Sequence, residues 1–374
     1  MKKFIIAPDS FKECMSAFDA CQIIEEEIRL AFKDATIICK PMADGGEGIG
    51  KVLQKALNAE PVLLQAKNAY NKVVQTHYYL SKDTNTAIIE MATICGLEMI
   101  LPSERNLIKA TSYGLGQLIK HAIDHGAQKV IVGLGGSACN DGGLGMLEAM
   151  GAQFFDHNNN AIPADMLHAL QIKTINLNTV FDLFKNTEIL IACDVDNPYI
   201  GPDGATRTFG KQKGGTSDVL DILENNLTYL NEVFISCFNQ DLSKIAKTGA
   251  AGGTSGTLCL CGAQLCSGID LILKETSFET YLMGADYCFT GEGSVDSQTI
   301  HGKTISGIAS LCKKHDVKLI VVAGCVKKDV DPLYHSGVTS IFSIINEPKT
   351  LESALDDGKE ALRCTIKNIC NLLS

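Results

Sequence analysis

Residues 3–42, KFIIAPDSFKECMSAFDACQIIEEEIRLAFKDATIICKPM, contain the pattern that decides the fold. Two runs, 3–9 and 36–42, are apolar on both faces and predict strands. Residues 16–32 carry apolar side chains at helical spacing, with Ser16 as a capping residue, and a second helix is expected over 48–57. Strands that alternate with helices in this way are typical of a parallel sheet covered by helices. The chain therefore begins as an α/β domain.

The same alternation returns near the C-terminus. Strands are expected at 286–293, 317–324 and 339–345, and helices at about 303–315 and 350–373. Because the two ends share this pattern and the middle does not, we predict one Rossmann-like parallel-sheet domain built from both ends, residues 1–60 plus 285–374. Residues 61–284 are predicted to form an inserted mixed α/β domain.

The inserted segment begins with three alternating runs, PVLLQAKN (61–68), KVVQTHYYL (72–80) and NTAIIEMA (85–92). Polar turns separate them, so they predict antiparallel strands. A helix at about 112–125 and strands at 129–136 and 188–195 follow. Since ligand sites often lie where two domains meet, we expect the site in a cleft between the two domains.

The composition excludes several classes of protein. Hydrophobic residues make up 45% of the 374 residues and charged residues 20%, as in a globular chain. The net charge of −10 argues against a nucleic-acid surface, and no apolar run suits a signal peptide or a membrane helix. The fifteen cysteines, odd in number and scattered, suit buried thiols in a reducing compartment. We therefore expect a cytoplasmic monomer or homodimer that binds small molecules, and neither nucleic acid nor membrane.

Five blocks rich in glycine and acidic residues each follow a strand-like run. Glycine lets backbone N–H groups approach an anion, and carboxylates hold cations or accept protons. Single Gly–Asp pairs form ordinary turns, but five such blocks favour phosphoryl transfer with Mg²⁺. The blocks are PMADGGEG (41–48), GLGGSACNDGG (133–143), ACDVDNP (192–198), GAAGGTSG (249–256) and TGEGSVDSQT (290–299).

The familiar kinase signatures, a Walker A loop or an HRD loop with a DFG triplet, do not occur in the sequence. The block GLGGSACNDGG nevertheless has the layout of an anion cradle, in which Gly135, Gly136 and Ser137 present N–H groups and a hydroxyl at a helix start. The first strand lacks the G-x-G-x-x-G fingerprint, which disfavours a nicotinamide-dependent dehydrogenase.

Seven motifs, in order along nearly the whole chain, support a family resemblance. They are APDSFKE (7–13), PMADGGEG (41–48), GLGGSACNDGG (133–143), ACDVDNP (192–198), FGKQKG (209–214), GAAGG (249–253) and TGEGSVDSQTIHGK (290–303). Together they resemble the pattern of the bacterial glycerate kinase family, type I. The resemblance implies ATP-dependent phosphorylation of D-glycerate to 2-phosphoglycerate, on a Rossmann-like domain with an inserted α/β domain.

Three residues are the predicted catalytic groups. Asp194 and Asp196 alternate at a strand end, so in an extended chain they point the same way and could share Mg²⁺ or poise one carboxylate as the base. A turn in which one of them caps Asn197 and Pro198 is the alternative. Lys12 is predicted to bind the glycerate carboxylate as a point charge, with a solvated lysine in a capping loop as the alternative.

The other site predictions divide between nucleotide and substrate. ATP is expected near the cradle block, with Lys213 neutralising charge on the transferred phosphoryl group. The expected nucleotide-binding residues are Gly135, Gly136, Ser137, Asn140, Asp141 and Lys213. The expected substrate-binding residues come from matched motifs after strand ends: Asp9, Ser10, Asp44, Glu292, Asp296 and Lys303. For Asp44, a helix N-terminus that favours acids is an equal alternative.

Two functional alternatives stay open at this point. One is a kinase for another small hydroxy acid on the same scaffold, because one pocket loop can change the substrate. The other is a metabolite-binding regulatory protein that has lost catalysis. The intact acidic blocks speak against the second alternative, since a relic would tolerate changes of Asp to Asn or Ala.

Overall fold

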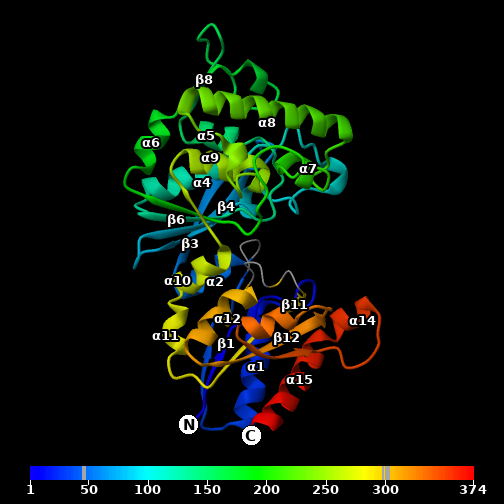
Figure 1. Cartoon of the computed structure of the whole chain (residues 1–374). Coiled ribbons are helices and arrows are strands. Elements are labelled where there is room, and N and C mark those ends of the chain that lie inside the picture. Colours follow the sequence, from blue (N-terminus) through cyan, green and yellow to red (C-terminus); the bar gives the residue numbers. More distant parts are fainter. Residues whose placement is uncertain (44–47, 297–298, 300–303) are drawn as a thin grey trace. The chain divides into compact units, whose positions relative to one another are not determined.

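The computed structural model of the chain describes residues 1–43, 48–296, 299 and 304–374. It contains two compact units, one formed by Met1–Asp44 with Gly268–Ser374 and the other by Gly45–Ser267 (Figure 1). The predicted α/β fold, with one parallel-sheet unit built from both chain ends, is confirmed.

The unit boundaries differ from the predicted ones at 60 and 284. Helix α2 (Ile49–Ala56) packs against strands of the second unit, although the sequence placed it in the first. Helix α10 (Gly268–Glu275) and helix α11 (Phe278–Leu282) pack against α12 (Thr304–Lys314) of the first unit. Packing of short amphipathic helices, rather than strand pattern, therefore decides where each unit ends.

The first unit is built on a five-stranded parallel sheet in the order β13-β12-β11-β1-β2. Its strands are β1 (Lys3–Ile6), β2 (Thr36–Cys39), β11 (Tyr287–Val295), β12 (Lys318–Val326) and β13 (Val338–Ser343). Ile5 in β1 pairs with Ile38 of β2 on one side and with Cys288 of β11, the central strand, on the other. The strand order thus reverses between β1 and β11, and doubly wound sheets bind ligands outside the carboxyl ends at such a switch point.

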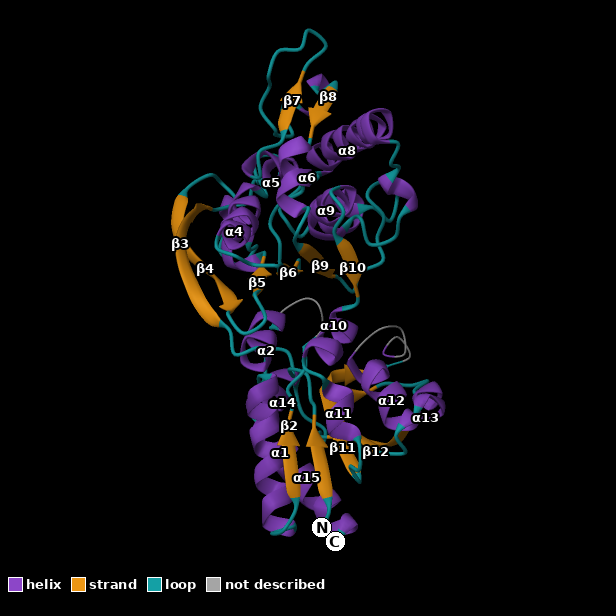
Figure 2. Ribbon diagram, turned by 90° about the vertical axis from the view of Figure 1, so that its left-hand side faces the viewer, coloured by secondary structure: helices purple, strands orange, loops and turns teal. Residues whose placement is uncertain are grey.

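Helices cover both faces of this sheet (Figure 2). On one face α1 (Ala17–Ala31) packs against α15 (Gly358–Leu373), and on the other α12 packs against α13 (Asp331–Ser336). Ser16 caps α1 as predicted, since its hydroxyl accepts the Asp19 N–H at 3.1 Å. Phe4, Ile24 and Ile366 are fully buried in the core between α1, α15 and the sheet.

The last helix is divided, whereas the sequence predicted one helix over 350–373. Helix α14 (Leu351–Asp356) ends before Asp357, its capping residue, and α15 begins directly after that residue. At Gly358 a Cβ atom would lie 2.2 Å from the Cys14 sulfur. The break therefore falls where a residue without a side chain lets the loop after β1 pack closely.

The second unit is built on a six-stranded sheet in the order β10-β9-β6-β5-β4-β3. Its first three strands pair antiparallel, as predicted, and β5, β6, β9 and β10 are parallel. The strands are β3 (Glu60–Lys67), β4 (Val73–Ser81), β5 (Thr86–Glu90), β6 (Lys129–Gly133), β9 (Glu188–Ala192) and β10 (Gln264–Cys266); β7 (Gln153–Phe155) and β8 (Thr174–Asn176) form a separate pair.

One side of this sheet carries α4 (Tyr113–Asp124), α5 (Leu144–Ala149) and α9 (Thr254–Leu260), and the other carries α2 (Figure 2). Leu118, Val132 and Leu147 are fully buried where the helices meet the sheet. The other helices are α3 (Ala92–Cys95), α6 (Asn178–Phe184), α7 (Ala205–Phe209) and α8 (Ser217–Phe238). Across the described ranges, no helix has the length and apolar character needed to cross a membrane.

The parallel strands of this sheet bring two glycine–acid blocks side by side. Glu90 at the end of β5 pairs with Gly133, and Gly133 pairs with Ala192 at the end of β9. The blocks 133–143 and 192–198 therefore leave the sheet at the same carboxyl edge, where α/β proteins bind ligands.

Candidate functional site

In the first unit, Asp9 lies at the switch point between β1 and β11. It is 7% exposed, and its backbone N–H donates to the Gly291 carbonyl at 2.8 Å. Its carboxylate accepts the Ser10 N–H at 2.6 Å and the Thr304 hydroxyl at 2.9 Å. Asp9 and Ser10, both predicted to bind substrate, thus lie together at the edge where a ligand is expected, with the carboxylate held by the start of α12.

Glu292 and Asp296, also predicted to bind substrate, belong to one polar network at the end of β11. The Thr299 hydroxyl donates to the Glu292 carboxylate at 3.1 Å and accepts the Asp296 N–H at 3.1 Å. The Asp296 carboxylate accepts the Lys327 ammonium at 3.1 Å. The structure therefore brings the two acids together through Thr299 and adds a cation, Lys327, that no motif marked.

Lys12 lies exposed on the loop after β1, beside Gly293 of β11. A Cβ atom at Gly293 would lie 3.5 Å from the Lys12 backbone nitrogen, so the glycine keeps this approach open. Lys12 also lines a cavity of about 120 Å³, together with Lys349. Two further predicted residues, Asp44 and Lys303, lie outside the described residues.

In the second unit, Lys213 and Ser137 meet beneath the loop after β6. Lys213 is 4% exposed, and its ammonium donates to the Ser137 hydroxyl at 3.0 Å and to the Cys139 carbonyl at 2.8 Å. Burial lowers the pKa of Lys213, while Cys139 and Asp141 nearby act in the opposite direction. The lysine therefore braces the predicted cradle from within the protein, and its contact with a phosphoryl group stays a prediction.

The cradle residues Gly135 and Gly136 lie at the surface above this lysine. Gly136 is exposed and has φ of 65°, in the left-handed region that favours glycine. The Gly136 carbonyl accepts the Leu97 N–H at 2.8 Å, which ties the loop to the segment after β5. The prediction put these residues at a helix start, but α5 begins only at Leu144, so Gly135 and Gly136 lie in a loop well before it, and phosphate binding there stays a prediction.

Asp141, predicted to bind the nucleotide, has its carboxylate turned into the protein and is 2% exposed. One oxygen accepts the Ser112 N–H at 2.7 Å and the Ser112 hydroxyl at 2.8 Å. The same oxygen accepts the Thr111 hydroxyl at 3.2 Å and the Gly145 N–H at 3.3 Å, and the other oxygen accepts the Gly143 N–H at 3.2 Å. This carboxylate joins the loop to the start of α4, so positioning the loop is the role that its contacts support.

Asn140, next to Asp141, is also fully buried. Its amide nitrogen donates to the Thr206 hydroxyl at 2.9 Å, which links the loop to α7. Its amide oxygen is buried and has no hydrogen-bond partner among the described residues. A buried acceptor left in this way costs about 1–3 kcal/mol, which is more typical of a functional site than of a simple core.

Asp194 and Asp196 lie after β9, both exposed, with the Asp196 side chain 85% exposed. Lys247 contacts this segment at two points: its ammonium donates to the Cys193 carbonyl at 3.0 Å and lies 3.8 Å from the Asp196 carboxylate. Its backbone N–H donates to the Asp196 carbonyl at 3.3 Å. The two predicted acids are therefore placed at the carboxyl edge of the sheet, next to a cation.

The sequence analysis did not select Lys247, which contacts the segment of the two acids. Lys247 has φ of 71°, in the left-handed region, as do ten other described non-glycine residues, so its contacts with Cys193 and Asp196 distinguish it. Its place just before the GAAGG block could have drawn attention to it.

Three or more His, Cys, Asp or Glu side chains do not cluster as a metal site anywhere in the described ranges. Asp194 and Asp196 are nevertheless of the type that Mg²⁺ needs, because this ion is usually bound by one or two carboxylates, waters and substrate phosphates and not by a cluster of protein ligands.

All fifteen cysteines are free thiols.

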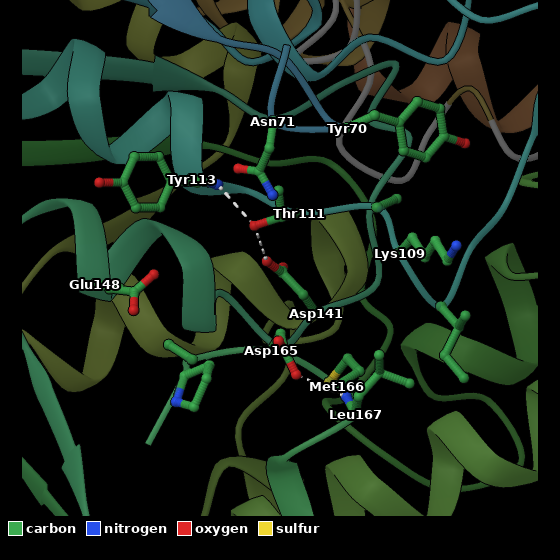
Figure 3. Close-up of a pocket in the computed structure, with 14 residues that line it drawn as sticks. Tyr70, Asn71, Lys109, Thr111, Tyr113, Asp141, Glu148, Asp165, Met166 and Leu167 are labelled. Atoms are coloured by element: carbon green, nitrogen blue, oxygen red, sulfur yellow. Dashed lines mark hydrogen bonds between the residues drawn. The ribbon is translucent and has the colours of Figure 1, made fainter. Parts of the chain in front are cut away.

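A pocket of about 350 Å³, lined by both polar and apolar side chains, lies in the second unit near Asp141. Figure 3 shows Tyr113 and Glu148 on one side of it and Tyr70 and Lys109 on the other. The segment 163–167 closes a further side. The pocket thus collects side chains from the turn between β3 and β4, the start of α4, α5 and an irregular segment.

The chain is similar to known proteins over its whole length. The model of the glycerate kinase family matches residues 4–374. A glycerate kinase of Bacillus subtilis (strain 168) is 38% identical over 368 residues, covering 98% of this chain and 96% of the relative. A glycerate 2-kinase of Escherichia coli (strain K12) is 37% identical over 369 residues, covering 98% and 95%. A crystal structure of a "putative glycerate kinase 2 from Salmonella typhimurium LT2" superposes with a TM-score of 0.88 at 37% identity, covering 100% of this chain and 98% of that one.

Proposed function

Because the chain belongs to the glycerate kinase family, we propose that it transfers the γ-phosphoryl group of ATP to D-glycerate and that the product is 2-phosphoglycerate. The observation that supports kinase activity is the match to the family model over residues 4–374, and a kinase of this family uses ATP as co-substrate. The printed name of the Escherichia coli relative, a glycerate 2-kinase at 37% identity, supports the 2-phosphate.

The chemistry assigns a role to each strand-end group. A hydroxyl oxygen of glycerate attacks the γ-phosphorus, the bond from that phosphorus to the β–γ bridging oxygen breaks, and ADP leaves. The hydroxyl proton passes to a carboxylate, which we assign to Asp194 because it is exposed at the carboxyl edge of the sheet. Lys12, exposed after β1, binds the glycerate carboxylate.

Asp196, with an oxygen of Asp194, would hold Mg²⁺, which supplies neutralisation of charge on the phosphate oxygens when bound. Lys247 keeps the segment of the two acids in place through its contacts with Cys193 and Asp196. Lys213 and Asp141 hold the cradle loop against α4, so that its N–H groups meet the phosphates in a fixed arrangement. That glycerate binds in a cleft between the two domains stays a prediction.

Steady-state ADP release, measured with D-glycerate and with other hydroxy acids at limiting ATP, tests the proposal. D-glycerate should give the highest kcat/KM, and L-glycerate, glycolate and lactate should act at best as weak substrates. If another acid gave a higher kcat/KM than D-glycerate, the substrate assignment would be wrong although the chain is a kinase.

A further inference from the structure

We propose that the pocket beside Asp141 binds the adenosine part of the nucleotide, an inference that rests on the proposed function. The pocket has a volume of about 350 Å³, within the range of small-molecule sites, and lies entirely in the second unit. Glycerate, with three carbons, is much smaller than this space.

The pocket adjoins the loop expected to receive the phosphates. Asp141 lines it, and its buried carboxylate accepts hydrogen bonds from Thr111 and Ser112 at the start of α4. The same residue leads into α5, on which Glu148 lines the pocket. A nucleoside in the pocket therefore lies next to Asp141, the residue of the loop 133–143 that lines it.

The walls suit a flat aromatic ring. Tyr70 is half-buried, and its hydroxyl accepts the Asn106 N–H at 2.7 Å, which fixes the orientation of its ring. Met166 is buried, and its carbonyl accepts the Asn226 side chain at 2.7 Å, so the wall opposite is also held. Base–aromatic stacking of this kind stabilises a bound base by about 1–3 kcal/mol.

The charges give the ligand an orientation. Glu148 places an exposed carboxylate at the pocket, which can accept a hydrogen bond from the amino group of adenine but repels phosphates. One oxygen of Asp165 is already bonded to the His168 ring and to the N–H groups of Leu167 and His168. Lys109 is exposed on the opposite side from Glu148 and forms no ion pair with any described residue. The base would therefore lie between Glu148 and Tyr70, with its amino group toward Glu148 and the phosphates leaving on the side of Lys109.

Calorimetric titration of the full-length chain with the non-hydrolysable analogue AMP-PNP tests this assignment. Lys109→Met removes the charge and keeps the stem, and Tyr70→Leu removes the ring; each should raise Kd for AMP-PNP and KM for ATP about tenfold, with KM for D-glycerate within twofold. Tyr70→Phe keeps the ring but loses the bond to Asn106, so it should raise Kd less than Tyr70→Leu does. Lys185→Met, an exposed lysine after α6 and outside the pocket, is the matched control.

The outcomes separate this inference from the proposed function. If the variants fold and turn over with Kd and KM for nucleotide within twofold of wild type, the pocket assignment is overturned and the kinase stands. If wild type binds AMP-PNP in a Lys109-dependent way without phosphorylating glycerate, the pocket stands and the substrate proposal fails.

Photolabelling of the wild-type chain with 2-azido-ADP gives a readout that needs no variant. The labelled peptide should contain Tyr70 or residues 163–167, and excess ATP should suppress the label. Label confined to peptides that do not line the pocket would overturn the assignment, as would an absence of nucleotide binding by wild type.

Discussion

Replacing Asp141 with asparagine should loosen the cradle loop measurably. Four of the five donors that meet the carboxylate reach one oxygen, including both groups of Ser112 at 2.7 and 2.8 Å. Asparagine can present its oxygen to these four, but its NH₂ group then faces the Gly143 N–H, which bonds the other oxygen in the native protein. The variant thus loses the charge on four bonds and leaves one buried donor opposed.

We estimate that the free energy of unfolding falls by about 3 kcal/mol. Each of the two shortest hydrogen bonds, which become neutral, accounts for about 0.5–1 kcal/mol, and the Gly143 N–H left facing an NH₂ group accounts for about 1–3 kcal/mol. For a domain of this size, that corresponds to a Tm lower by about 6–12 °C. Differential scanning calorimetry measures it, with the exposed Asp182→Asn as a control that should shift Tm by about 1–2 °C at most.

The same loosening should raise KM for ATP, because the loop carries Gly135 and Gly136. A Tm for Asp141→Asn within 2 °C of wild type would refute the reasoning, since it would show that the buried carboxylate contributes no more than an amide does.

Three further predictions concern the groups around the two carboxyl edges. Burial lowers the pKa of Lys213, so the charged lysine lowers the free energy of unfolding below that pKa, and this cost disappears as pH rises toward the unfolded pKa of 10.5. The urea midpoint of wild type should therefore rise relative to that of Lys213→Met between pH 7 and pH 10. A constant difference between the two midpoints would contradict this. Lys247→Gly places glycine at a left-handed backbone position, which costs glycine less strain, and removes the cation beside Asp196. We expect a free energy of unfolding within about 1 kcal/mol of wild type but a kcat/KM about tenfold lower. An unchanged kcat/KM would exclude the positioning role of Lys247. Asp194→Asn and Lys12→Ala should each lower kcat/KM at least about 100-fold, and near-normal values would remove them from the catalytic set.

Much of the fold could be predicted because each element depends on neighbouring residues. Ser16 caps α1 through the N–H of a residue three positions away, and the apolar runs at 3–9 and 129–136 need only their own composition to predict strands. The division between α14 and α15 could not be predicted, since it depends on Cys14 approaching Gly358 from the other end of the chain.

The candidate site divides in the same way. The glycine–acid blocks could be found from their place after strands, and the sheet register brings two of them to one edge. The roles of Lys213 and Asp141 could not be found, because Lys213 contacts a serine 76 residues away and Asp141 a serine 29 residues away. A polar residue in a glycine-rich loop looks the same in sequence whether it faces a ligand or holds the loop from inside.

The central claim is best tested by ³¹P NMR of the full-length chain with ATP, Mg²⁺ and D-glycerate, because one spectrum detects turnover and distinguishes the two phosphate esters. We predict a new phosphomonoester resonance at the shift of 2-phosphoglycerate, growing as the ATP signals are replaced by those of ADP. A resonance of 3-phosphoglycerate would contradict the assigned hydroxyl, and unchanged ATP with D-glycerate present would contradict the proposed reaction itself.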